Sequence, residues 1–227
     1  MIVGITGLIG SGKDTAADYL CTFHGYKRMS FAGTLKDAVA AVFDWNRELL
    51  EGSTKHSREW REQVDEWWSN RLGIPNLTPR WVLQRWGTEV CRQGFHNDIW
   101  VASVENKLRN TKEDIVITDC RFPNELTAIK GAGGITMRCH RGENPEWYSY
   151  AELYNTIENA GQRELCMAKL NYYNVHASEY SSVGLTYDYH LNNNKTITEL
   201  HQQIESIRNQ ISPFPSNLPT LDNFYAI

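Results

Sequence analysis

Apolar and polar positions alternate along the chain with the periods of buried strands and of amphipathic helices. Residues 2 to 6, "IVGIT", form a mostly β-branched apolar run. Such a run is typical of a strand that is buried on both faces of a parallel sheet. The segment from 13 to 25 then places its apolar residues at helical spacing and stops at Gly25. The pattern predicts a strand, a glycine-rich turn and a helix, in that order.

The same order recurs further along the chain. More strands are predicted at residues 27–32, 114–119, 135–139 and 187–191. Helices are predicted at residues 33–45, 78–93, 98–108, 122–134 and 196–211. Strands that alternate with helices predict an α/β fold, in which helices flank both faces of a parallel sheet and ligands bind beyond the carboxyl ends of the strands.

Local signals support three of these helices. Thr78 and Pro79 are typical of an N-cap followed by the first helical residue, and Thr196 with Glu199 forms a capping box. The helix near residue 33 carries an apolar stripe of Leu35, Ala38, Val39, Val42 and Phe43. The last helix carries a stripe of Ile197, Leu200, Ile204, Ile207 and Ile211. Both stripes are expected to face the core.

Two segments interrupt the alternation. Residues 45–79 are polar and rich in tryptophan, with helical character around Trp60, Val64 and Trp67, and they predict an inserted lobe. Residues 142–180 are aromatic and rich in amides, as in a second insertion or lid. We therefore expect one domain over residues 1–211, followed by a proline-containing tail at 212–227 to which no structure is assigned.

Composition narrows the class of protein. The formal charge of −4 argues against a protein that mainly grips a nucleic acid polymer. The chain contains neither a basic segment before an N-terminal apolar run nor about 18 consecutive apolar residues, so neither export nor membrane spanning is predicted. Five cysteines are scattered without a C-x-x-C pair, which indicates reduced thiols in a cytoplasmic protein.

The segment "GLIGSGKDTA" matches G-x-x-x-x-G-K through Gly7, Gly12 and Lys13. Glycines let backbone N–H groups surround phosphates, and the lysine reaches the β- and γ-phosphates. A glycine turn with an incidental lysine is the alternative, but the position between a buried strand and a helix favours a phosphate-binding loop. Residues expected to bind the nucleotide are Gly10, Ser11, Gly12, Lys13, Asp14 and Thr15.

Asp14 stands where such loops usually place a hydroxyl for magnesium. Direct coordination would add anionic repulsion beside the triphosphate. We expect Asp14 to hold the metal through water or to orient a basic residue, and Thr15 to contact phosphate. The alternative is that Asp14 only favours the positive helix terminus, worth about 0.3 to 1 kcal/mol.

Asp119 and Arg121 follow the buried strand "IVIT", at the edge that also carries the phosphate-binding loop. From this position an aspartate can reach magnesium, directly or through water, and an arginine can bind phosphate bidentately. The alternatives are a helix N-cap for the segment after Pro123 and a surface arginine. Lys13, Asp119 and Arg121 are the predicted catalytic residues, and Asp14 and Asp119 the predicted metal ligands.

A wider set of motifs resembles one family. "GLIGSGKDTAADYL", "FAGTLKDA", "TPRWVLQRWGTEVCR" with "DIWV", "ITDCRFPNE", "HASE" and "HLNNNKTITEL" are similar, in this order, to the motifs of bacteriophage-type deoxynucleoside monophosphate kinases. The resemblance implies a P-loop kinase fold and transfer of the γ-phosphoryl group of ATP to a deoxynucleoside 5′-monophosphate, with Mg²⁺. It also implies a homodimer, located in the host cytoplasm if a phage encodes the chain.

The resemblance further implies an acceptor side lined by Lys36, Arg80, Gly87, Thr88, Trp100, Asp119 and Arg121. By its own chemistry Lys36 could hold the acceptor phosphate, or be a solvated helix lysine. Trp100 could stack on a base or pack in the core. Glu179 could bind a sugar or base hydroxyl, Arg141 is a weaker cation candidate, and His176 is interpreted as structural.

Two other functions remain open at this point. Dephospho-coenzyme A kinases have a similar N-terminal motif, although Asp14 and the "LQRWGTE" block disfavour that acceptor. A regulatory protein that hydrolyses ATP would explain the loop and Asp119, but it leaves the basic residues of the acceptor side without a role. The preferred base is not readable from these residues.

Overall fold

The computed structural model describes residues 1–211, and the predicted tail 212–227 lies outside this range. Its centre is a five-stranded sheet in the order β2-β3-β1-β4-β5, in which every pair of neighbours is parallel. The strands are β1 (Ile2–Thr6), β2 (Lys27–Met29), β3 (Ile115–Ile117), β4 (Ile135–His140) and β5 (Tyr189–Asn192). The predicted α/β fold is confirmed.

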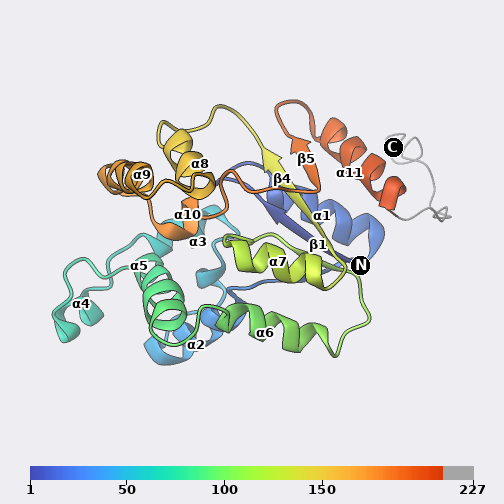
Figure 1. Ribbon diagram of the computed structural model, residues 1–227. Helices are drawn as coiled ribbons and strands as arrows, with labels where there is room; N and C mark the ends of the chain where they lie inside the picture. Colours follow the sequence, from blue (N-terminus) through green and yellow to red (C-terminus); the bar gives the residue numbers. More distant parts are fainter. Residues whose placement is uncertain (212–227) are drawn as a thin grey trace.

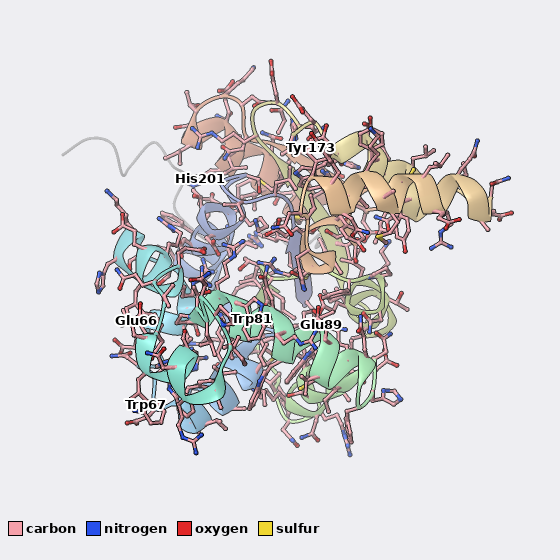
Figure 2. All side chains as sticks on the ribbon, turned by 90° about the vertical axis from the view of Figure 1, so that its left-hand side faces the viewer. Glu66, Trp67, Trp81, Glu89, Tyr173 and His201 are labelled. Atoms are coloured by element: carbon pink, nitrogen blue, oxygen red, sulfur yellow. The ribbon has the colours of Figure 1, made fainter. Side chains whose placement is uncertain are left out.

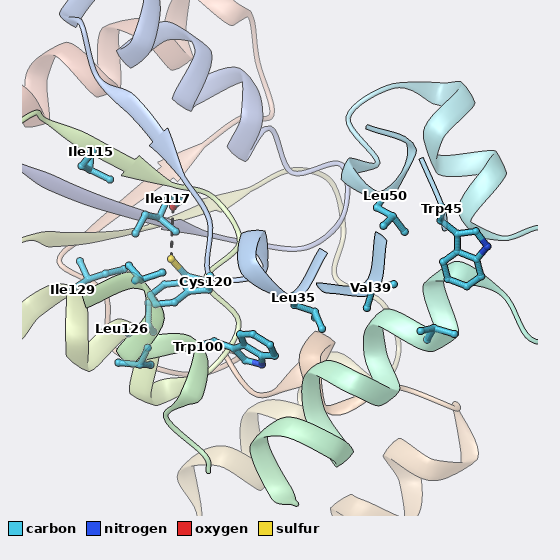
Figure 3. Packing of buried hydrophobic residues seen from close by; sticks show 14 of the residues in the cluster. Leu35, Val39, Trp45, Leu50, Trp100, Ile115, Ile117, Cys120, Leu126 and Ile129 are labelled. Atoms are coloured by element: carbon cyan, nitrogen blue, oxygen red, sulfur yellow. Dashed lines mark hydrogen bonds between the residues drawn. The ribbon is translucent and has the colours of Figure 1, made fainter. Parts of the chain in front are cut away.

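Helices cover both faces of the sheet (Figure 1). One face carries α1 (Lys13–His24) and α11 (Ile197–Ile211). The opposite face carries α2 (Gly33–Phe43), α6 (Ile99–Leu108) and α7 (Pro123–Gly131). Figure 3 shows the packing on this second face, where Ile117 lies next to Cys120 and Leu35 lies next to Trp100.

The first insertion contains a short 3-10 helix and two α-helices. They are η1 (Leu49–Glu51), α3 (Lys55–Arg61) and α4 (Glu66–Leu72). The helix predicted at 78–93 is divided: α5 (Pro79–Arg85) continues as η2 (Trp86–Gln93), which has π-helical hydrogen bonding. Thr78 caps α5 by accepting a hydrogen bond from the Trp81 backbone N–H at 3.1 Å, as predicted.

The second insertion contains α8 (Tyr148–Thr156), α9 (Ala160–Tyr172) and α10 (Ala177–Tyr180). These helices enclose their own small apolar cluster of Ala151, Leu170, Tyr180 and Val183. Figure 1 places the two insertions on the same side of the molecule, away from α11. No helix within residues 1–211 has the length and apolar character that a membrane span requires.

The predicted helices exist, but each of the two predicted apolar stripes includes at least one residue that is exposed. In α2, Leu35 and Val39 are buried with Phe43, whereas Ala38 is exposed and Val42 is 53% exposed. In α11, Ile197 is 61% exposed. One face of each helix packs into the core, α2 mainly against neighbouring helices and α11 against β5 and α1, so residues at the margin of the stripe stay in solvent.

The strand predicted at 27–32 ends early, at Met29. The backbone N–H groups of Phe31 and Ala32 donate to the Asp119 carboxylate instead of to a neighbouring strand. This side chain, distant in the sequence, therefore turns the chain from β2 into α2.

Candidate active site

The phosphate-binding loop connects β1 with α1. Gly10 and Gly12 have φ values of 78° and 99°, which favour glycine because a Cβ is strained there. The Ser11 N–H donates to the Leu8 carbonyl at 3.1 Å, and the Lys13 ammonium donates to the same carbonyl at 2.8 Å. The loop thus curls around the end of the Lys13 side chain.

Two residues to which the sequence analysis assigned no role in the site, Cys139 of β4 and Asn193 after β5, hold the loop in place. The Ser11 carbonyl accepts hydrogen bonds from the Cys139 thiol and from the Asn193 side-chain amide, each at 3.0 Å. A Cβ added to Gly12 would lie 2.2 Å from the Asn193 amide nitrogen. Asn193 lies within the quoted "HLNNNKTITEL" motif, but its contact with a loop at the other end of the chain was not readable from the motif.

The loop has the properties of a polyphosphate site. The Ser11 hydroxyl is buried and has no hydrogen-bond partner among the described residues. Burial, reinforced by the positive charge of Arg121, lowers the pKa of Lys13. Both groups gain from an anion, which would accept from the hydroxyl and neutralise the ammonium. The residues present therefore fit the phosphates of ATP.

Asp14 makes two side-chain contacts at the edge of the loop. Its carboxylate accepts from the Arg28 guanidinium at 3.1 Å and from the Thr118 hydroxyl at 3.0 Å. Arg28, from β2, also donates to the Asp14 carbonyl at 2.8 Å. Asp14 thus contacts a basic residue that the sequence analysis did not name, and its side chain is 75% exposed.

The carboxylates of Asp14 and Asp119 fit a magnesium site that waters and substrate phosphates would complete. No group of three or more His, Cys, Asp or Glu side chains within residues 1–211 could hold a metal ion alone. Mg²⁺ is commonly bound by one or two carboxylates together with waters and substrate phosphates. Asp14 and Asp119 are compatible with such a phosphate-dependent site.

Asp119 turns its carboxylate toward the segment that precedes α2. It accepts from the Ser30 hydroxyl at 2.6 Å, from Phe31 N–H at 3.1 Å and from Ala32 N–H at 2.9 Å. The alternative role as N-cap of α7 is wrong, because Phe122 occupies that position. The magnesium role stays a prediction.

Arg121 lies between the phosphate-binding loop and the second insertion. Its guanidinium donates to the Ser178 carbonyl at 3.2 Å, and its charge acts on Lys13. Its backbone N–H donates to Glu125 at 2.6 Å. Glu125 is buried and paired with Arg92, and burial raises the pKa of Glu125 to about 7. This buried pair holds the turn that presents Arg121.

A cleft of about 590 Å³ lies between the second insertion and the helical segment α5–η2, and two residues of the first insertion, Glu62 and Thr78, also line it. Its lining includes Arg80, Gln84, Thr88, Glu89, His176 and Glu179. Arg80 donates to Glu62 at 2.9 Å and to Glu179 at 2.8 Å, so it joins the two insertions. Figure 2 shows Trp81 and Glu89 on this side of the molecule, below the segment that carries Tyr173. Three predicted acceptor residues, Arg80, Thr88 and Glu179, are brought together here.

The other five predicted acceptor residues do not line this cleft: Asp119 and Arg121, described above, and Trp100, Gly87 and Lys36. Trp100 is 8% exposed and donates its indole N–H to the Gly87 carbonyl at 2.9 Å, a placement that favours packing over base stacking. Gly87 fits tightly, because a Cβ there would lie 2.9 Å from the Leu35 side chain. Lys36 is paired with Glu51 at 2.6 Å.

His176 and Arg141 complete the set of predicted residues. The His176 ring accepts from the Ser178 backbone N–H at 3.2 Å and thereby caps α10. Because that bond occupies Nδ1 as an acceptor, the other ring nitrogen carries the proton toward Glu89, 3.3 Å away. This geometry agrees with a structural role. Arg141 is exposed just beyond β4.

The parallel sheet, the glycine loop at the start of α1 and the cations at the strand ends define a P-loop α/β nucleotide-binding protein. A protein of Acanthamoeba polyphaga mimivirus, provisionally described as a deoxynucleotide monophosphate kinase, is 30% identical over 218 residues, 91% of this chain and 95% of the relative. The deoxynucleoside-5′-monophosphate kinase of Escherichia phage T5 is 46% identical over 186 residues, 60% of this chain and 74% of the relative. The chain belongs to the deoxynucleoside monophosphate kinase family.

Solved structures resemble the chain only at the level of general architecture. The dephospho-CoA kinase of Campylobacter jejuni has a TM-score of 0.40 at 13% identity and covers 94% of this chain and 98% of its own. The shikimate kinase of Aquifex aeolicus has a TM-score of 0.42, also at 13% identity, and covers 93% and 98%. Neither likeness bears on the acceptor. No family model matches the chain.

Proposed function

We propose that the protein transfers the γ-phosphoryl group of ATP to a deoxynucleoside 5′-monophosphate. An oxygen of the acceptor phosphate forms a bond to the γ-phosphorus. The bond from that phosphorus to the bridging oxygen breaks, and its electron pair leaves with ADP. The observation that carries the proposal is the position of Arg121, which acts electrostatically on Lys13 and also contacts the insertion that closes the cleft.

In this proposal the phosphate-binding loop positions ATP. The loop N–H groups and Lys13 bind the β- and γ-phosphates, with Ser11 and Thr15 donating hydroxyl hydrogen bonds. When bound, Mg²⁺ supplies neutralisation of the phosphate charge, with Asp14 and Asp119 as its protein-side partners. Arg121 then stabilises charge on the transferred group, between the two substrates.

The acceptor is proposed to lie in the cleft between α5–η2 and the second insertion. Arg80, Thr88 and Glu179 line it and supply cationic, hydroxyl and carboxylate groups for a nucleoside monophosphate. Lys36, Gly87 and Trp100 do not line the cleft, and Trp100 supports η2 by donating its indole N–H to the Gly87 carbonyl. Relatives from a phage and a mimivirus support a further proposal, that the protein acts in a host cytoplasm. The homodimer that the family resemblance implies stays a prediction.

An ADP-release assay tests the reaction. The panel contains deoxynucleoside monophosphates, ribonucleoside monophosphates and dephospho-coenzyme A, and Lys13→Ala serves as the inactive control. We expect ADP release that depends on at least one deoxynucleoside monophosphate. Turnover with dephospho-coenzyme A alone would favour that kinase, and equal ADP release without any acceptor would favour a regulatory ATPase. Light scattering tests the homodimer.

A further inference from the structure

We infer that Arg61, at the end of α3, binds the phosphate of the acceptor together with Arg80 and Arg121. The inference rests on the proposed function and adds a binding residue to it from the first insertion. The sequence analysis treated this segment as an inserted lobe and assigned no chemistry to Arg61.

The position of the Arg61 guanidinium depends on Gly52. Gly52 ends η1 with a φ of 68°, and a Cβ placed there would lie 2.2 Å from the Arg61 Cζ atom. Any side chain at residue 52 would therefore displace the guanidinium. The absence of a side chain at this residue creates the space in which the charged group packs.

Arg61 lacks the partners that neighbouring arginines have. Its Nε atom is buried without a hydrogen-bond partner among the described residues, and none of the ion pairs within residues 1–211 includes Arg61. By contrast, Arg80 is paired with both Glu62 and Glu179. A buried donor without an acceptor is unfavourable, so an acceptor from a ligand would stabilise this arrangement.

The surrounding charge favours an anion as the ligand. Burial lowers the pKa of Arg61, and the positive charges of Arg80 and Arg121 lower it further, against the opposing charges of Glu62 and Glu51. Three guanidinium groups that repel one another are stabilised by an anion bound among them, and guanidinium groups bind phosphate bidentately.

The contacts next to Arg61 place the anion on the acceptor side. Glu62, the following residue, lines the cleft and accepts from Arg80 at 2.9 Å, so α3 ends at the cleft. The positive charge of Arg121 acts on both Lys13 and Arg61. Arg80, which acts on Arg61, lines the same cleft. A phosphate held by Arg61 and Arg80 would thus be the phosphate of the acceptor, facing Arg121 and the γ-phosphate.

The first test compares Arg61→Ala with Arg58→Ala. Arg58 lies one turn earlier on α3, is exposed, and donates only to the backbone carbonyls of Gly52 and Ser53. We measure KM for the best deoxynucleoside monophosphate at saturating ATP, KM for ATP, and binding of the monophosphate and of its deoxynucleoside by calorimetry. Loss of a charged hydrogen bond predicts a monophosphate KM and Kd about 10- to 100-fold higher for Arg61→Ala. Arg58→Ala, KM for ATP and deoxynucleoside binding should change less than about twofold.

The second test moves the guanidinium without removing it. Gly52→Ala should raise the monophosphate KM in the same direction as Arg61→Ala, because the new methyl group collides with Arg61. Gly73→Ala is the matched control: Gly73 ends α4 with a φ of 66°, and no heavy atom lies within 4 Å of a Cβ placed there. Both substitutions introduce the same backbone strain, so only the collision differs between them.

The outcomes separate this inference from the proposed function. Normal monophosphate KM and Kd in folded Arg61→Ala would overturn the role of Arg61 and leave the kinase activity intact. If Arg61→Ala does not fold, Gly52→Ala against Gly73→Ala decides, and equal KM values for these two would overturn the inference. A wild-type protein that neither phosphorylates nor binds any deoxynucleoside monophosphate would overturn both proposals.

Discussion

At the scale of single residues, Lys13 and Arg121 are proposed to stabilise the charge of the transferred phosphoryl group from two sides. Lys13 lies inside the ATP loop, whereas Arg121 reaches the second insertion. We expect Lys13→Ala and Arg121→Ala to lose about 10³-fold or more in kcat/KM, because each removes charge from the transferred group. Lys13→Ala should weaken ATP binding more, and Arg121→Ala the monophosphate, as measured by calorimetry. Unchanged turnover in either variant with a native circular dichroism spectrum would exclude that residue from the site.

Asp14 combines an ion pair with a position at the edge of the phosphate-binding loop. If its main role is to serve the metal, Asp14→Ala should shift the magnesium requirement for activity upward, and Asp14→Ser should restore it in part. If its main role is to orient Arg28, then Arg28→Ala should reproduce the defect of Asp14→Ala. The measurement is activity against magnesium concentration at saturating ATP for all four proteins. Identical magnesium curves would leave only the favourable helix-terminus charge, worth about 0.3 to 1 kcal/mol.

At the scale of elements, α1 and α11 cover the same face of the sheet and contact each other through a pair of stacked aromatic rings. The His201 ring stacks on Tyr19 with centroids 4.0 Å apart. Burial lowers the pKa of His201 below its ordinary value of 6.5, against the opposing charge of Glu205. The unfolded chain therefore takes up a proton before the folded protein does as pH falls. The contribution of neutral His201 to the free energy of unfolding is therefore fully present above the pKa of this histidine in the unfolded chain. It is lost as the pH falls from that value toward the lower pKa of the folded protein.

Urea unfolding at about pH 7.5 and about pH 5.5 tests this coupling. His201→Phe keeps a stacking ring and removes the titrating group, so its free energy of unfolding should fall less between the two pH values than that of the wild type. His56→Phe, at an exposed position of α3, is the control and should follow the wild type. A His201→Phe protein with the full wild-type pH dependence would assign the pH dependence to other groups.

At the scale of the whole molecule, the second insertion forms a separate packing unit. Its apolar cluster is distinct from the two clusters on the faces of the sheet. Polar contacts connect it across the cleft, among them Arg80 with Glu179 and Arg121 with the Ser178 carbonyl. A small unit held in this way is expected to open more readily than the sheet.

Hydrogen exchange tests that expectation. Amides of α8 and α9 should exchange faster than those of β1 and β3 in the free protein, and they should slow when ATP and a deoxynucleoside monophosphate bind. At about 100 times Kd, ligand binding can add at most about 2.7 kcal/mol of protection. The strand amides serve as the internal control. Exchange in α8 and α9 that equals the strand rates, or that ligands leave unchanged, would contradict a mobile second insertion.

The local features of the fold were predictable from the sequence. β1, the glycine loop and α1 follow from a β-branched run, a glycine spacing and a helical apolar period. The Thr196–Glu199 capping box also exists as predicted, with Glu199 N–H donating to the Thr196 hydroxyl at 3.2 Å. These features depend on residues a few positions apart, whose interactions are set by local backbone geometry.

Contacts between distant segments were not predictable in this way. Asn193 supports the loop at Ser11, Arg28 pairs with Asp14, and Arg61 packs on Gly52 beside Arg80 and Arg121. The sequence alone determined the α/β alternation, the phosphate-binding loop and the two motifs that contain Arg80 and Arg121. Only the tertiary structure decided which carboxylates neutralise which cations and that the buried Nε of Arg61 has no partner among the described residues, because charges interact through space and not along the chain.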